Sequence, residues 1–410
     1  MRDWDQGREA AFFDLLSRYL DLERDTSRSY AAGEYSLERM PLLARLAGNP
    51  ERQLGIVHVA GTKGKGSTCH FLTCLLTAAG QRVGTFASPH LSTVRERFLL
   101  DGGLIDYAPL LEQTRELAAK IEAADLSPGF FEILTVLGLQ LFVRAGCRLA
   151  VVETGIGGRL DATNYIQNPL CTAITPVSLD HMQILGDTVG EIAAEKAGIL
   201  KPGVPLVLAK QPFPAAEQVI LDRARELGVP VERPVPLAEA RDWLPADTPD
   251  FLLENFTVSL RVCQLLGYEP RRADFRMPEL RGRFEIIQRD PLVLLDAAHN
   301  ADSARRLAEA LRQRFPGQSW TVVVGVAKGK DVPGIVRELA AIDGEFVLTN
   351  PRPPKASGLA ELVAAARDTG IRYRVIDQIQ TPADLPGGRP LLFTGSFFAA
   401  LIGEELYSHR

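Results

Sequence analysis

Residues 55–68 read GIVHVAGTKGKGST, and this stretch decides the fold class. Its first half, 55–60, is a short apolar run with three β-branched residues, which predicts a buried strand. Glycines follow, and then a segment to Gly80 places apolar side chains at helical spacing. A strand, a glycine-rich turn and a helix in this order predict an α/β protein that holds a phosphate group at the turn.

The turn itself supplies the predicted phosphate contacts. Its backbone can wrap a phosphate because glycines adopt conformations closed to other residues. Lys65 can reach the outer phosphates as a point charge. The turn is a variant of the P-loop, since a glycine separates this lysine from the hydroxyl residue that normally follows it. The predicted nucleotide-binding residues here are Gly61, Thr62, Lys63, Gly64, Lys65, Gly66 and Ser67; Lys63 is either a second cation or a solvated side chain.

Further strands and helices alternate on both sides of this turn. We expect strands at 149–153, 171–175 and 204–208, helices at 130–143 and 252–266, and an irregular connection at 230–250. A second alternating pattern starts at Leu292 after a Pro- and Arg-rich linker, 268–282. The fold class is therefore α/β: an N-terminal P-loop ATPase domain with a mostly parallel sheet, 1–277, and a C-terminal Rossmann-like α/β domain, 283–410.

Composition excludes several classes of protein. The chain has 410 residues, a net charge of -5 and no long basic block, so we expect no nucleic-acid partner. The five cysteines form no CxxC pair, which favours free thiols over disulfides or zinc. The charged N-terminus and the lack of a long apolar run predict no signal peptide and no membrane partner. We therefore expect a cytoplasmic enzyme.

Three more features carry candidate chemistry. Glu153 ends an apolar strand, where α/β sheets place ligands, and its carboxylate suits Mg²⁺. His181 follows Leu179-Asp180, and Lys196 stands in Glu195-Lys196-Ala197-Gly198. Taken alone, a single histidine is usually structural and a single helix lysine is usually solvated. These two residues therefore become functional candidates only together with the other motifs of the chain.

Taken together, these motifs make the chain resemble the folylpolyglutamate synthase/dihydrofolate synthase family, within the Mur ligase group. The resemblance runs from about Leu37 to the C-terminus. The matching pieces occur in the family's order: YSLERM…LAGNP, HVAGTKGKGST, ASPHLSTVRERF, FFEILT, VETGIGGRLDATN, SLDHMQILGDT, EKAGILKPG, GRFE, LLDAAHN and TGSF. Ten such motifs in order make the resemblance highly specific.

The resemblance implies roles for individual residues. Lys65, His181 and Lys196 would be catalytic, and Lys196 would be carbamylated. Two Mg²⁺ ions are implied, the first held by Ser88 and Glu153 and the second by His181. Asn255 would contact adenine, Arg283 phosphate and Asp296 ribose, while His299 and Ser396 would hold the incoming glutamate.

The implied activity is an ATP-dependent amide ligase that adds L-glutamate to dihydropteroate, tetrahydrofolate or both through an acyl phosphate. Its partners would be small molecules (a folate or pteroate, L-glutamate and ATP), and the family is generally monomeric. Two alternatives stay open. One is a Mur-type ligase acting on a different, non-folate carboxylate, suggested by Lys63 in place of the usual Asn and by a short segment between Pro205 and Asn255. The other is a nucleotide-binding switch without ligase activity.

Overall fold

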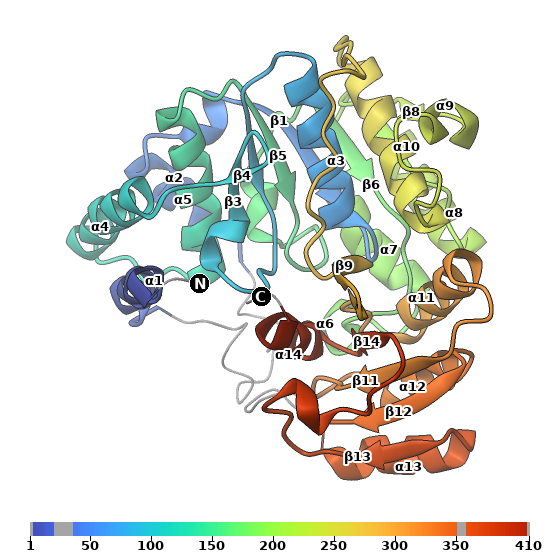
Figure 1. Cartoon of the computed structure of the whole chain (residues 1–410). Helices are drawn as coiled ribbons and strands as arrows, with labels where there is room; N and C mark the ends of the chain where they lie inside the picture. The colour runs from blue at the N-terminus through green and yellow to red at the C-terminus, as the bar shows by residue number, and fades with distance from the viewer. Residues whose placement is uncertain (1–2, 20–35, 351–357, 408–410) are drawn as a thin grey trace. The chain divides into compact units, whose positions relative to one another are not determined.

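The computed structural model describes residues 3–19, 36–350 and 358–407, which fall into two compact units. Unit 1 comprises Met1–Thr248 and Leu252–Pro278, and unit 2 comprises Pro249–Phe251 and Glu279–Arg410. Each unit has its own sheet and its own helices (Figure 1). Both are α/β, so the predicted fold class is confirmed.

The sheet of unit 1 has eight strands among the described residues, in the order β4-β3-β2-β5-β1-β6-β7-β8. The strand that leads into the glycine-rich turn, β1 (Gly55–Ala60), pairs in parallel with β5 and β6. Only the hairpin edge is antiparallel, where β3 pairs with β2 and β4. The other strands are β2 (Val83–Phe86), β3 (Phe98–Leu100), β4 (Gly103–Leu104), β5 (Leu149–Glu153), β6 (Cys171–Ile174), β7 (Leu206–Leu208) and β8 (Val231–Glu232).

Helices cover both faces of this sheet. Successive residues of a strand point to opposite faces. On β2, the hydroxyl of Thr85 meets that of Thr73 on α3 (Lys65–Ala78), whereas Gly84 lies directly under the ring of Phe142 on α5 (Phe130–Arg144). Helices α3 and α5 therefore pack on opposite faces, and the sheet between them is buried as parallel sheets require.

Two apolar clusters hold helices of unit 1 on the two sides of the sheet's centre. Toward β2–β4, a large apolar cluster joins α1, α2, α4 and α5; toward β6 and β7, a second cluster joins α7 and α8. The bounds of these and the shorter helices are α1 (Asp3–Leu16), α2 (Met40–Leu46), α4 (Tyr107–Ala123), α6 (Met182–Leu185), α7 (Val189–Ala197), α8 (Pro214–Glu226), α9 (Leu237–Arg241) and α10 (Asp250–Leu265).

Unit 2 has a six-stranded sheet in the order β13-β12-β11-β14-β10-β9, parallel except for β9. Helix α14 (Phe397–Tyr407) packs closely on β10 and β14, because Gly403 lies against Leu295 and Phe393. The other elements are β9 (Glu285–Arg289), β10 (Leu292–Leu295), α11 (Ala301–Arg314), β11 (Trp320–Val324), α12 (Val332–Leu339), β12 (Gly344–Leu348), α13 (Leu359–Thr369), β13 (Tyr373–Val375) and β14 (Leu391–Thr394).

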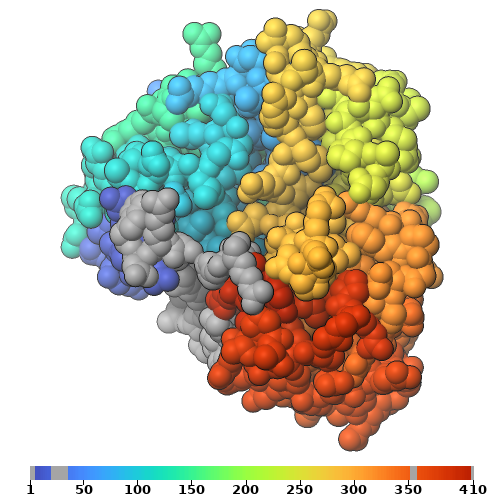
Figure 2. Space-filling model, viewed as in Figure 1, coloured from blue at the N-terminus to red at the C-terminus, as the bar shows by residue number. Residues whose placement is uncertain are grey.

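Two sequence-based expectations need correction. The connection 230–250 is not wholly irregular, since it contains the edge strand β8 and the short helix α9. The alternating pattern of unit 2 starts before Leu292, because β9 precedes it as an antiparallel edge strand. By contrast, the chain after α10 does run as an extended segment across the surface of unit 1 (Figure 2, yellow-orange), where the amide of Arg271 donates to the carbonyl of Ala78 at 3.2 Å.

Candidate active site

The glycine-rich turn joins the carboxyl end of β1 to the first turn of α3. Gly61 has φ 147° and Gly64 has φ 79°, both in the region that favours glycine. A Cβ on Gly61 would collide with Thr175, and one on Gly64 would collide with the amide of Asn255. The turn is also held by the loop after β6, since the amides of Thr62 and Lys63 donate to the carbonyl of Pro176 at 3.0 and 3.1 Å. The donors that this turn offers to a phosphate are therefore the first-turn amides of α3, which begins at Lys65.

Two lysines from different helices meet at this turn. The Nζ of Lys65, the first residue of α3, donates to the carbonyl of Gly61 at 3.1 Å, and the Nζ of Lys196, on α7, donates to the same carbonyl at 3.0 Å. Lys196 is 4% exposed. Burial, and next the charge of Lys65, lower the pKa of Lys196 to about 7. The structure thus concentrates positive charge where α3 already presents the positive end of its dipole.

A carboxylate lies beside this positive charge. Glu153 ends β5 and is 4% exposed. Its Oε2 accepts a hydrogen bond from the amide of Ser88 at 3.1 Å and lies 3.4 Å from where a Cβ on Gly66 would be. Ser88 follows β2, the neighbour of β5 in the sheet. The structure therefore brings the predicted metal ligands Ser88 and Glu153 together next to the glycine-rich turn.

The loop after β5 is fixed by a buried polar chain that sequence reasoning missed. The Thr163 hydroxyl donates to Asp161 Oδ1 at 2.5 Å, so its oxygen accepts from Nε2 of His58 at 2.7 Å. Oδ2 of Asp161 accepts from the amide of Ile156 at 2.8 Å. Burial lowers the pKa of His58 to about 3, which keeps it neutral. A histidine within the apolar strand 55–60 is the signal that could have indicated this contact.

The other predicted residues of unit 1 lie around the same turn or near it. Asn255, on α10 and 6% exposed, packs directly against Gly64 of the glycine-rich turn. His181 precedes the short helix α6 with a left-handed φ of 50°, its side chain is 38% exposed, and its Nε2 lies 3.9 Å from Oδ1 of Asp180.

In unit 2, a buried carboxylate is engaged by the backbone. Asp296 is 7% exposed at the end of β10. Its Oδ2 accepts from the amide of Phe284 and its Oδ1 from the amide of Ala298, both at 2.9 Å. Asp296 therefore fixes the start of β9 and the turn that leads toward α11. A position at the carboxyl end of a parallel strand is where α/β sheets bind ligands.

Three more predicted residues of unit 2 gather around Phe397. The guanidinium of Arg283 lies over the Phe397 ring, 4.5 Å from its centroid, and the ring of His299 lies 6.4 Å from it. Ser396 is 2% exposed; its hydroxyl donates to the carbonyl of Gly325 at 2.6 Å and accepts from the amide of Ala399 at 3.1 Å. The structure places Arg283, His299 and Ser396 together, but the Ser396 hydroxyl already has two partners.

The donor set at Glu153 decides which metals fit. Among the described residues, no group of three or more His, Cys, Asp or Glu side chains could hold a metal ion. Mg²⁺ needs fewer protein ligands, because it keeps several waters and binds through one or two carboxylates plus substrate phosphates. The single carboxylate of Glu153, with Ser88 beside it at the glycine-rich turn, therefore fits Mg²⁺ and does not fit zinc. The five cysteines are free, and Cys74 alone is not fully buried.

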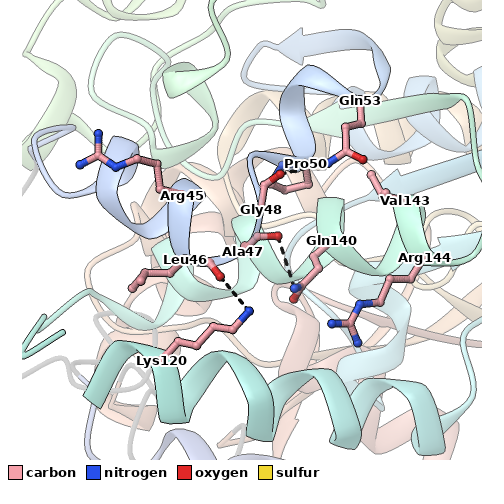
Figure 3. A pocket seen from close by; sticks show the side chains of 10 residues that line it. All are labelled: Arg45, Leu46, Ala47, Gly48, Pro50, Gln53, Lys120, Gln140, Val143 and Arg144. Carbon is pink, nitrogen blue, oxygen red and sulfur yellow. Dashed lines mark hydrogen bonds between the residues drawn. The ribbon is translucent and has the colours of Figure 1, made fainter. Parts of the chain in front are cut away.

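A pocket of about 260 Å³ lies elsewhere in unit 1 (Figure 3). It is formed where α2 and α5 end, and Lys120 on α4 borders it by donating to the carbonyl of Leu46 at 3.1 Å. These helix ends precede β1 and β5, so the pocket lies at the amino ends of these strands and not at the glycine-rich turn.

Within the described residues, no helix is long and apolar enough to span a bilayer.

Known proteins resemble this chain in sequence and structure. A family model for "Mur ligase, glutamate ligase domain" matches residues 282–385. A Bacillus subtilis protein named dihydrofolate synthase/folylpolyglutamate synthase is 33% identical over 364 residues, which cover 80% of this chain and 84% of that protein.

Solved structures cover the chain almost completely. Mycobacterium tuberculosis folylpolyglutamate synthase, complexed with ADP and AMPPCP, is 29% identical, with a TM-score of 0.82 over 92% of this chain and 96% of that one. A bifunctional folylpolyglutamate synthase/dihydrofolate synthase with Mn, AMPPNP and L-glutamate bound is 29% identical, with a TM-score of 0.78 over 92% and 95%. The chain belongs to the folylpolyglutamate synthase/dihydrofolate synthase family.

Proposed function

We propose that this protein is an ATP-dependent ligase that adds L-glutamate to a folate-type carboxylate, dihydropteroate or tetrahydrofolate or both. The observation that carries the proposal is the meeting of Lys65 and Lys196 on one carbonyl, next to the buried carboxylate of Glu153. That arrangement suits a nucleoside triphosphate with a divalent cation. The bound ADP, AMPPCP, Mn and L-glutamate named for the solved relatives support the same assignment.

In the reaction, a carboxylate oxygen of the acceptor attacks the γ-phosphorus of ATP, and ADP leaves as an acyl phosphate forms. The first-turn amides of α3 and the Nζ of Lys65 would hold the phosphate oxygens as negative charge develops on them. The amine of glutamate then attacks the acyl carbon, loses a proton and displaces phosphate. When bound, Mg²⁺ would neutralise phosphate charge, with Ser88 and Glu153 holding one ion and His181 a second.

Lys196 has the environment expected of a carbamylated lysine. Carbon dioxide reacts only with the neutral amine, and burial lowers the pKa of Lys196 to about 7, so much of the amine is neutral at that pH. The carbamate would replace a buried cation with an anion next to Lys65. This exchange would relieve the repulsion between the two lysines and supply oxygen ligands to metal.

Unit 2 would supply the glutamate site and part of the nucleotide site. Asp296 is held rigidly by two amides and would bind ribose, and Arg283 would contact phosphate. His299 would bind the incoming glutamate together with Ser396, whose hydroxyl keeps room for one more contact. We expect the enzyme to be a monomer.

A product assay by mass spectrometry tests the function. The enzyme is incubated with ATP, Mg²⁺ and glutamate, separately with dihydropteroate and with tetrahydrofolate. A gain of one glutamate on dihydropteroate identifies dihydrofolate synthase activity, and a gain on tetrahydrofolate as well makes the enzyme bifunctional. No gain on either acceptor, although ATP binds, would contradict the folate assignment and favour a ligase acting on a different carboxylate.

A further inference from the structure

The segment that follows Ser88 is held by three carboxylates. Glu153 accepts from the amide of Ser88 at 3.1 Å. Glu96, which lies within the same segment, accepts from the amides of Leu91, Ser92 and Thr93 at 2.6, 3.1 and 3.3 Å. The next amide, that of Val94, donates to a carboxylate from a distant part of the chain, Glu9 on α1, at 2.8 Å.

Glu9 makes further contacts with this segment. Its Oε2 accepts from the Thr93 hydroxyl at 2.8 Å and from the hydroxyl of Tyr107, the first residue of α4. Thr93, Val94 and Tyr107 are 6%, 0% and 2% exposed, so these donors would be costly to leave without a partner. Burial, and next the hydrogen bond to Glu9, raise the pKa of Tyr107 to about 12, so its hydroxyl keeps its proton and donates at neutral pH.

A second residue of α1 lies against the same segment. The ring of Phe13, one turn after Glu9, lies 6.3 Å from the ring of His90 and 6.2 Å from that of Phe130. His90 in turn accepts from Nε of Arg97 at 2.8 Å, and Arg97 is 1% exposed. Helix α1 therefore contacts both ends of the stretch between Pro89 and Val94, directly after the predicted metal ligand Ser88.

We propose that Glu9 is a positioning residue: from α1 it holds Thr93 and Val94, completes with Glu96 the anchoring of residues 91–94, and thereby sets the place of Ser88 beside Glu153 and the glycine-rich turn. The inference rests on the proposed metal role of Ser88. A carboxylate suits this place because it accepts from the amide of Val94 and from both hydroxyls at once, whereas an amide could keep its contacts only if one hydroxyl turned to accept from its N–H. Removing Glu9 would free one end of the segment while Glu153 still holds the other.

The test compares Glu9→Gln with Asp14→Asn, the same change of carboxylate to amide on the exposed face of α1. Mn²⁺ binding in the presence of ADP is titrated by electron paramagnetic resonance, and amide hydrogen exchange of 91–94 is measured on the whole protein. We expect Glu9→Gln to weaken Mn²⁺ binding about tenfold and to speed exchange of 91–94, while Asp14→Asn changes neither. Glu9→Asp, which keeps the charge, should recover part of the affinity.

Each possible result either supports or contradicts the proposal. Unchanged exchange in Glu9→Gln would overturn the anchoring, and faster exchange with unchanged Mn²⁺ affinity would overturn its effect on Ser88. Because a fall in thermal stability alone could weaken all binding, the affinity for ADP without metal is measured in parallel and should not change. Neither titration needs glutamate or a folate. If Glu9→Gln weakens Mn²⁺ binding but the wild-type protein makes no glutamyl product, this inference holds and the proposed ligase function is contradicted.

Discussion

The glycine-rich turn of unit 1 and the Asp296 region of unit 2 compensate the charges of their side chains in opposite ways. At the turn, two ammonium groups share one carbonyl, and one of them is buried with a lowered pKa. At Asp296, two backbone amides satisfy one carboxylate, and the neighbouring Ser396 hydroxyl both donates and accepts. The two positive charges at the turn destabilise the fold and favour an anionic ligand, whereas the hydrogen bonds at Asp296 stabilise the fold. Substitutions should therefore separate activity from stability at the turn and couple them at Asp296.

The largest expected effect is on activity alone. Lys65→Ala should lower the rate of product formation with every acceptor by about 10²- to 10³-fold, because it removes the charge that we propose acts on the transferring phosphate. Its melting temperature should not fall, since a cation in the first turn of a helix opposes the dipole. Rates and thermal melts check this, with Lys120→Ala, an exposed lysine of α4, as the control. Retention of a tenth of the activity would contradict the phosphate role.

Lys196→Ala tests the role of the second lysine at the glycine-rich turn. We expect the activity to fall about tenfold or more, and short carboxylates such as acetate to restore part of it by replacing the carbamate oxygens. Because the folded pKa of Lys196 lies below its unfolded value, the protonated side chain destabilises the fold, and wild-type stability should rise as the pH increases from about 7 toward 10.5. Lys196→Ala should lose that rise. An unimpaired variant would refute the carbamate.

Asp296→Asn should lower activity and stability together. The asparagine keeps one acceptor for two buried amides, so unfolding of unit 2 should become easier by about 1–3 kcal/mol. Urea unfolding measures the loss, and Asp343→Asn, an exposed aspartate of unit 2, provides the matched control. A variant that loses activity but keeps the wild-type stability would contradict this prediction, because it would show that Asp296, like the lysines of the turn, affects activity without stabilising the fold.

A smaller effect tests the scaffold beneath the turn. The pKa of His58 is about 3 in the folded protein against 6.5 for an ordinary histidine, so its contribution to stability is complete above pH 6.5 and is lost as the pH falls toward 3. At pH 5 this loss amounts to about 2 kcal/mol. Unfolding at pH 7 and pH 5 should show a steeper acid loss in the wild type than in His58→Gln, whose amide can still donate to Thr163. Equal losses would contradict the buried neutral histidine.

Sequence alone determined the turn and the family. The run 55–60, the glycines after it and Lys65 predicted β1, the glycine-rich turn and α3, because local spacing and glycine chemistry decide such a junction. The strand 149–153 was predicted with its observed bounds, since a short continuous apolar run leaves little choice of period. Ten motifs in order indicated the family that the comparisons establish. The substrate roles of single residues remain predictions.

Only the tertiary structure decided how distant residues share one environment. The turn and α7 are far apart in the chain, yet Lys65 and Lys196 meet at one carbonyl because neighbouring parallel strands deliver their loops to the same edge of the sheet. The same holds for His58 with Thr163, and for Glu9 with Val94. Such contacts carry no local spacing that a sequence pattern could reveal, and burial, which sets the pKa of Lys196, exists only after the chain has packed around it.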